Sequence, residues 1–219
     1  MFAAGFPPNW NESEFCVEEL RWCGMILTKE GIKQVPERVE ALGKLKDPEN
    51  FDEAESLIGM IGWQREFVNN LAGLMKPIYD IQNAERKRKE WRKKYRGYRR
   101  KMPDKLMGRW VWSKECKEAK RRVLEEMKKD VLLYRTDERG ILKIYVDFAE
   151  KNNRISAFLS QEREGEEVPI SYASRKLREN ETDSGTPFCE LLAIEFGINK
   201  FENIISGLLF ILTIDPYKA

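Results

Sequence analysis

Apolar residues recur at helical spacing through most of the first half of the chain. A hairpin of extended chain is predicted over 15–27, because short apolar stretches there flank turn-forming residues. Three runs with apolar residues three or four positions apart follow, over 36–47, 51–67 and 71–81. Pro36 suits the first turn of a helix, where its missing N–H costs nothing. The pattern predicts a hairpin followed by three short helices.

In the second half the spacing of apolar residues changes from a helical to an alternating period. The predicted elements are, in order, a helix over 113–129 capped by Ser113, strands over 140–148, 155–161 and 168–174, a helix over 184–205 and a strand over 208–214. Three antiparallel strands and a crossover helix return the fourth strand parallel to the first. The expected fold class is therefore α/β (α+β), with a small helical unit followed by a mixed sheet that packs on its crossover helix.

Basic residues concentrate between the two halves. The segment 85–109 holds thirteen Lys and Arg and three acidic residues, a net charge of +10, while the whole chain carries +2. Trp91, Tyr95 and Tyr98 follow one another at helical spacing, so on a helix they form an aromatic stripe among cations. Such a stripe suits stacking on bases with cations on phosphates. The candidate contacts are Trp91, Arg92, Lys93, Tyr95, Tyr98 and Arg99. The alternative is a solvated linker whose charges only keep it soluble.

The composition excludes several classes of site. The 219 residues include no histidine, so a Ser-His-Asp triad, an HExxH zinc helix and a Cys₂His₂ finger cannot be built from this chain alone. The four cysteines form no CxxC pair, which predicts free intracellular thiols. No apolar stretch approaches the ~20 residues that a bilayer span needs. We expect an intracellular protein, cytoplasmic or nuclear, without membrane contact.

Three acidic residues occupy positions that the predicted topology brings to one edge of the sheet. Asp147 ends the first strand, Glu190 lies in the first turn of the crossover helix, and Asp215 follows the last strand. Three neighbouring carboxylates repel one another unless a divalent cation neutralises them, and oxygen ligands suit Mg²⁺ or Mn²⁺. The reaction implied is metal-assisted phosphodiester hydrolysis. Taken singly, each acid also has an ordinary structural explanation, at a strand end, a helix start or a turn.

Several motifs together resemble a known family. The strings PISYASRKL (169–177), CELLAIEFGINKF (189–201) and LTID (212–215) look like the ribonuclease H-like domain of gypsy-type long-terminal-repeat retrotransposon polyproteins. VWSKECKEAKRRVLEEMKKDVLL (111–133) and IYVDFAE (144–150) are similar to the helix that leads into that domain and to its first acidic strand. RWCGMILTKEGIKQVPERVEAL and ESLIGMIGWQREFVNNLAGLMKPIYDI resemble the primer-gripping hairpin and thumb of the same reverse transcriptases.

The resemblance implies both a domain order and roles for particular residues. Residues 1–30 correspond to the end of the palm with the primer-grip hairpin, 31–81 to a helical thumb, 82–109 to a basic linker and 110–219 to a C-terminally truncated ribonuclease H-like domain. The resemblance makes Asp147, Glu190 and Asp215 the catalytic acids that hold Mg²⁺ or Mn²⁺. It places Trp22, Cys23 and Gly24 at the primer grip.

Departures from the family pattern limit the expected activity. The paired aspartates of the polymerase palm are absent, and the chain stops four residues after Asp215. Phe148 follows the first acid where the family has a small residue, and Ile214 and Pro216 replace the threonine and histidine that flank the third acid. The leading hypothesis is a reverse transcriptase fragment that holds RNA/DNA hybrid or another nucleic acid and is inactive without the remainder of a polyprotein. The alternatives are a non-catalytic exapted interaction module, which binds nucleic acid or protein, and a decayed product without function.

Overall fold

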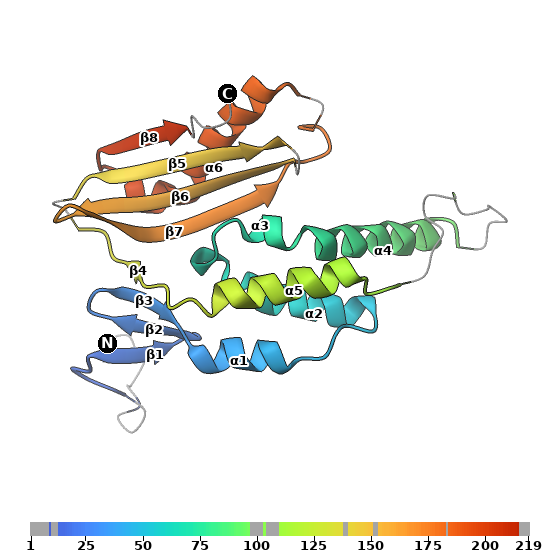
Figure 1. Cartoon of the computed structure of the whole chain (residues 1–219), viewed down its shortest axis with the longest axis horizontal. Coiled ribbons are helices and arrows are strands. Elements are labelled where there is room, and N and C mark those ends of the chain that lie inside the picture. The colour runs from blue at the N-terminus through green and yellow to red at the C-terminus, as the bar shows by residue number, and fades with distance from the viewer. Residues whose placement is uncertain are drawn as a thin grey trace.

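The structure is a computed structural model that describes residues 13–96, 110–137, 140–150, 153–182 and 184–214, together with Asn9 and Pro103. The larger sheet lies along the helices, and the small sheet lies at one end of them (Figure 1). The small sheet contains the N-terminal strands, and the larger sheet carries its own helix, α6, on one face. The expected combination of a helical unit with an open mixed sheet is confirmed.

The predicted hairpin is confirmed and belongs to a four-stranded sheet. Its strands are β1 (Glu19–Trp22), β2 (Met25–Thr28), β3 (Gly31–Gln34) and β4 (Leu133–Tyr134), in that order. Cys23 and Gly24 form the turn with φ of 48° and 80°, the left-handed conformation that matches the twist of a two-residue hairpin. At Gly31 a Cβ atom would lie 2.0 Å from the carbonyl oxygen of Leu133. Glycine therefore permits the close pairing of β3 with β4, which the sequence pattern did not predict.

The helices of the first half share one apolar core. They are α1 (Pro36–Lys44), α2 (Phe51–Gly62), the 3-10 turn η2 (Arg65–Phe67), α3 (Leu71–Leu74) and α4 (Lys76–Lys94). Asn50 caps α2, since its side chain accepts a hydrogen bond from the N–H of Glu53 at 2.9 Å. Leu57, Ile61 and Ile78 are fully buried in this core. The three predicted helical runs therefore form one helical layer.

Helix α5 (Lys114–Met127) packs into the same layer. Its buried side carries Cys116, Ala119, Val123 and Met127, which lie in the core of the N-terminal helices. Lys120 is also buried there, and its Nζ donates to the backbone carbonyl that follows α1 at 2.6 Å. The predicted domain boundary groups this helix with the larger sheet, and its apolar stripe packs in the core of the N-terminal helices.

The segment 82–109, predicted as a basic linker, is helical in its first part. Helix α4 continues to Lys94, because its sequence is rich in helix-forming Glu, Gln, Lys and Arg. Two ion pairs hold this extension against α2, from Arg86 to Glu55 at 3.1 Å and from Lys89 to Asp52 at 2.9 Å. The first part of the basic segment, up to Lys94, is therefore a continuation of α4.

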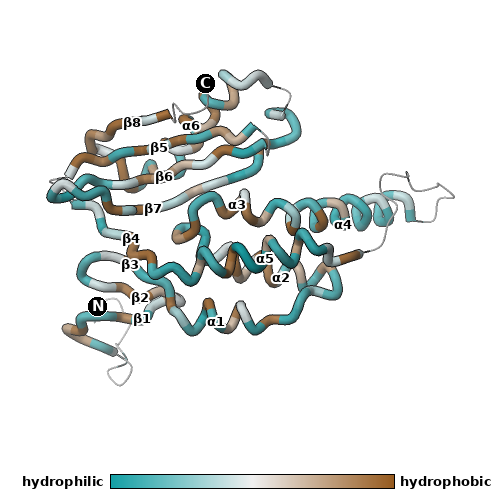
Figure 2. The backbone as a smooth tube through the Cα atoms, viewed as in Figure 1, coloured by the Kyte–Doolittle hydropathy of each residue, from teal (hydrophilic) through white to brown (hydrophobic). Residues whose placement is uncertain are grey.

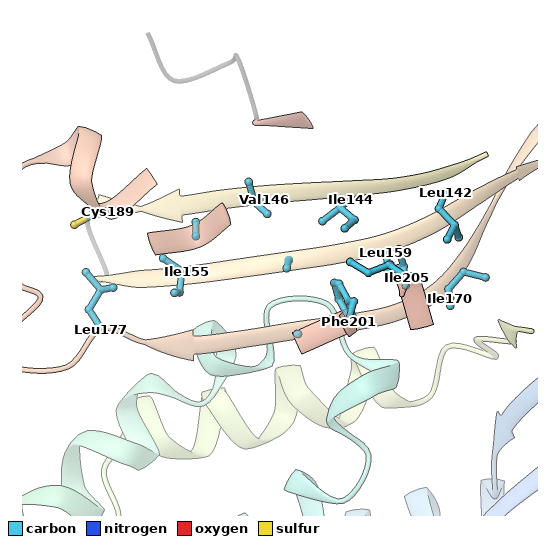
Figure 3. Close-up of a cluster of buried hydrophobic side chains, with 13 residues drawn as sticks. Leu142, Ile144, Val146, Ile155, Leu159, Ile170, Leu177, Cys189, Phe201 and Ile205 are labelled. Atoms are coloured by element: carbon cyan, nitrogen blue, oxygen red, sulfur yellow. The ribbon is translucent and has the colours of Figure 1, made fainter. Parts of the chain in front are cut away.

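The larger sheet has the predicted topology. Its elements are β5 (Leu142–Ala149), β6 (Arg154–Arg163), β7 (Glu166–Lys176), helix α6 (Thr186–Ile205) and β8 (Phe210–Ile214). The strand order is β7-β6-β5-β8, with β8 parallel to β5 and the other pairs antiparallel. Side chains of β5, β6 and β7 pack with α6 to form the core of this unit (Figure 3). The crossover connection is confirmed.

The two edge strands of the larger sheet differ in what packs against them. Strand β8 is hydrophobic along its length (Figure 2), and Ile211 and Ile214 expose nearly half of their surface. At the opposite edge, β7 meets the helical layer, where Ser174 accepts a hydrogen bond from the N–H of Ala72 at 3.0 Å. Lys176 forms an ion pair with Asp80 of α4 at 3.3 Å.

No helix in the described part of the chain combines the length and apolar character that a bilayer span requires.

Candidate functional site

The parallel pairing of β5 with β8 brings the segments that lead to two predicted acids side by side. Val146 pairs with Ile214. Asp147 is the next residue of β5 and is half-buried, while Asp215 is the next residue of the sequence after Ile214. Asp215 itself lies outside the described residues. The predicted strand geometry is therefore confirmed up to the position before the third acid.

The third element of the candidate site is the amino end of α6. Glu190 is exposed in this end of the helix, and its neighbour Cys189 is buried. The pKa of the Cys189 thiol is raised, chiefly by burial and also by the negative charges of Glu181 and Glu150. Because Glu150 directly follows β5, this coupling places the amino end of α6 near the carboxyl end of β5.

A close contact fixes α6 over β5. A Cβ atom at Gly197 would lie 2.9 Å from Cγ1 of Val146 and 3.3 Å from Cβ of Ala157. Only a glycine lets the helix approach the sheet this closely. The strand residue before Asp147 is thus packed against the helix that carries Glu190.

The donors fit a hard divalent cation. Asp147 and Glu190 offer carboxylate oxygens, the ligands that Mg²⁺ and Mn²⁺ take. Glu150 adds further negative charge to the same region. Among the described residues, which exclude Asp215, no group of three Cys, Asp or Glu is arranged to hold a metal ion. The three-acid ligand set stays a prediction.

The hairpin tip contains the predicted primer-grip residues. Trp22 ends β1 with 59% of its surface exposed. The carbonyl oxygen of Cys23 accepts a hydrogen bond from Nε1 of Trp63 at 3.2 Å. Gly24 lies against the guanidinium of Arg38, since a Cβ there would lie 1.9 Å from Nη1. These contacts from α1 and from the residue after α2 hold the tip in place while Trp22 stays open.

A recess beside the hairpin was not predicted from the sequence. It has a volume of about 440 Å³ and lies between α1 and α2. Its lining residues are Arg38, Ala41, Leu42, Leu45, Gly59, Met60, Trp63 and Gln64. Gly59 and Gly62 face open space, so the backbone of α2 is accessible there. The signal in the sequence was the GMIGW string, in which two glycines interrupt a helical pattern and a large aromatic follows.

The basic segment supplies an aromatic pair on α4. The rings of Trp91 and Tyr95 lie 5.0 Å apart between centroids, at 45° to each other. Trp91 lies in the last turn of α4, and Tyr95 is the residue that follows the helix. Arg92 and Lys93 are exposed beside it. Tyr98 and Arg99 lie outside the described residues.

Comparison with known proteins identifies relatives for almost the whole chain. Residues 112–212 match the family described as the RNase H-like domain found in reverse transcriptase. The chain is 26% identical over 201 residues to the retrovirus-related Pol polyprotein from transposon gypsy of Drosophila melanogaster, covering 90% of this chain and 17% of the polyprotein. It is 23% identical over 217 residues to the corresponding polyprotein from transposon opus of the same species, covering 93% and 19%. The chain therefore spans less than a fifth of these relatives.

Solved structures show the same fold. The foamy viral protease-reverse transcriptase in complex with RNA/DNA hybrid matches with a TM-score of 0.69 and 16% identity, over 93% of this chain and 25% of that one. The same viral protein in complex with double-stranded DNA matches with a TM-score of 0.66 and 17% identity, over 92% and 37%. The predicted resemblance is confirmed: residues 112–212 match the RNase H-like domain found in reverse transcriptase, and the chain is similar to retrotransposon Pol polyproteins over 90% or more of its length.

Proposed function

We propose that this chain holds an RNA/DNA hybrid and that Asp147, Glu190 and Asp215 together bind Mg²⁺ or Mn²⁺. The observation that carries the proposal is the parallel register of β5 and β8, which leads two of these acids out of adjacent strands. Support for the hybrid comes from the foamy viral protein of the same fold, whose structure was solved with that ligand.

The chain's own residues have separate roles in this proposal. The carboxylates at the end of β5 and at the start of α6 hold the cation, which supplies charge neutralisation and an activated water for cleavage of the RNA strand. Gly197 keeps α6 against β5 so that these carboxylates stay at one end of the sheet. Trp22 and the recess beside it contact the hybrid at a distance from the acids.

Cleavage belongs to the full polyprotein in this proposal, and the isolated chain binds without efficient hydrolysis. The family pattern around the acids is incomplete in this chain, where Phe148 and Ile214 flank the first and third acids. The remainder of the polyprotein is the expected partner, since these relatives are parts of larger polyproteins.

Two measurements on one set of proteins test the proposal. Isothermal titration with Mn²⁺ compares the wild type with Asp147→Asn and with Asp130→Asn, a matched control at an exposed acid near the end of α5. We expect Mn²⁺ binding in the wild type and the control and its loss in Asp147→Asn. Fluorescence anisotropy with a labelled RNA/DNA hybrid is measured on the same proteins in parallel. Equal Mn²⁺ binding by all three proteins would refute the metal site.

The non-catalytic interaction module remains the second candidate. The observation that favours it is the exposed Glu150 next to β5, in a part of the sequence where the family pattern has a short glycine-containing turn. It predicts hybrid binding without any Mn²⁺ binding in the titration. A labelled hybrid incubated with Mg²⁺ or Mn²⁺ then stays intact with both wild type and Asp147→Asn.

A further inference from the structure

The basic residues of α4 divide into two groups. Four consecutive cations in its middle pair with acids of the same chain. The pairs are Arg86 with Glu55, Lys87 with Glu179, Arg88 with Glu85 and Lys89 with Asp52, at distances between 2.6 and 3.1 Å. Arg86 and Lys89 hold α4 against α2, Lys87 joins it to the turn after β7, and the pair of Arg88 lies within α4. Each already has a carboxylate partner, so they are poor candidates for binding phosphate.

The last turn of α4 is different. Arg92 exposes 60% of its side chain and lies 3.8 Å from Glu85, whose other oxygen already accepts from Arg88. Lys93 is exposed, and no ion pair to it occurs within the described part of the chain. The aromatic pair of Trp91 and Tyr95 stands beside these cations. Exposed cations and the half-buried rings of Trp91 and Tyr95 thus coincide at the carboxyl end of α4.

The ion pair of Lys87 fixes the direction in which this turn faces. Lys87 is bound to Glu179, in the connection between β7 and α6, at 2.7 Å. Trp91 follows Lys87 by four residues and therefore lies on the same face of the helix. The carboxyl end of β5, the connection to α6 and the outer half of α4 lie toward the same end of the molecule (Figure 1). The aromatic face is therefore turned toward the unit that carries Asp147.

We propose that the outer turn of α4 binds single-stranded nucleic acid, with bases stacked on Trp91 and Tyr95 and with Arg92 and Lys93 on the phosphates. A single strand fits better than a duplex because its bases are free to stack on aromatic rings, whereas duplex bases stack on one another. The site lies apart from the acids at β5. The position suits a single strand that leaves the hybrid at that end of the molecule. This choice of occupant rests on the proposed function.

Charge-matched variants test the assignment of the cations. Anisotropy with a labelled oligothymidine single strand compares Arg92→Ala/Lys93→Ala with Arg86→Ala/Lys87→Ala, which removes the same net charge from cations that already have partners. We expect roughly tenfold weaker binding for the first variant and a change below about twofold for the second. The log-log salt slope of the first variant should be shallower by about 1.4, since each single-strand phosphate contact contributes about 0.7.

Substitutions of Trp91 test the stacking. Trp91→Ala should weaken binding by at least about fivefold, while Trp91→Phe retains most of the affinity because a stacking surface remains. Circular dichroism of each variant shows whether α4 stays helical. The proposal is overturned if both double variants lose affinity equally, if helical Trp91→Ala binds as the wild type does, or if a blunt duplex binds more tightly than the single strand. None of these readouts depends on hydrolysis, so a failure here leaves the metal site untouched.

Discussion

The contact between α6 and β5 gives a prediction about two glycines that differ only in their surroundings. Gly59 in α2 has open space where a Cβ would lie, whereas a Cβ at Gly197 would lie 2.9 Å from Val146 and 3.3 Å from Ala157. Alanine gains about 1 kcal/mol over glycine inside a helix at either position. At Gly197 the overpacking costs about 1–3 kcal/mol, because the β-sheet side chains must move. Gly59→Ala should therefore stabilise the protein. The free energy of unfolding of Gly197→Ala should be lower than that of Gly59→Ala by about 1–3 kcal/mol.

Urea unfolding followed by circular dichroism measures both free energies of unfolding. A second comparison isolates the contact: in a Val146→Ala background, where Cγ1 is gone, Gly197→Ala should lose most of its penalty. The coupling energy between the two substitutions should reach at least about 0.5 kcal/mol, as for residues in direct contact. Equal stabilisation by Gly59→Ala and Gly197→Ala would refute the close packing of α6 on β5.

Three further predictions concern the stability of the fold. The pKa of Glu181 is lowered, chiefly by the hydrogen bond that its carboxylate accepts from Arg175. Its stabilising contribution is therefore present above its unfolded pKa of about 4.3 and is lost as the pH falls through the lower folded value. In urea unfolding, the free energy of unfolding of Glu181→Gln should be lower than that of the wild type at pH 6 and should converge with it toward pH 3. Lys120→Met should cost about 2 kcal/mol in the same assay, because the carbonyl after α1 loses a buried charged donor. Gly31→Ala should destabilise the protein by more than about 2 kcal/mol, since its Cβ meets the backbone at Leu133, and unchanged hydrogen exchange at β3 would contradict this.

Local pattern was sufficient for most elements and for the topology of the larger sheet. The alternation in β5, β6 and β7 and the helical spacing in α6 predicted a parallel return of β8, because a crossover of this kind has one favoured arrangement. The position of Asp147 at the end of β5 followed from the same pattern. The chemistry of the acids came from the resemblance, since each acid by itself is an ordinary residue at a strand or helix end.

Other features depend on contacts between distant segments, which no local pattern contains. Strand β4 has two residues, too few for a detectable alternation, and its pairing depends on the missing side chain at Gly31. The amphipathic pattern of α5 predicted which side of the helix is buried, but not which core that side packs into. The hydrogen bond from Trp63 to Cys23 joins residues forty positions apart. In the basic segment the helical spacing of the aromatic residues was visible, but the ion pairs that join α4 to α2 were not.

The central claim is that the ends of β5 and β8 and the amino end of α6 meet around one cation. Nuclear magnetic resonance of the ¹⁵N-labelled chain with substoichiometric Mn²⁺ tests it most directly, since the ion broadens amide signals according to their distance from it. The account predicts simultaneous broadening at Phe148, Cys189 and Ile214, and its disappearance in Asp147→Asn. Broadening at only one of these segments, or at the exposed acids of α5 instead, would contradict the account.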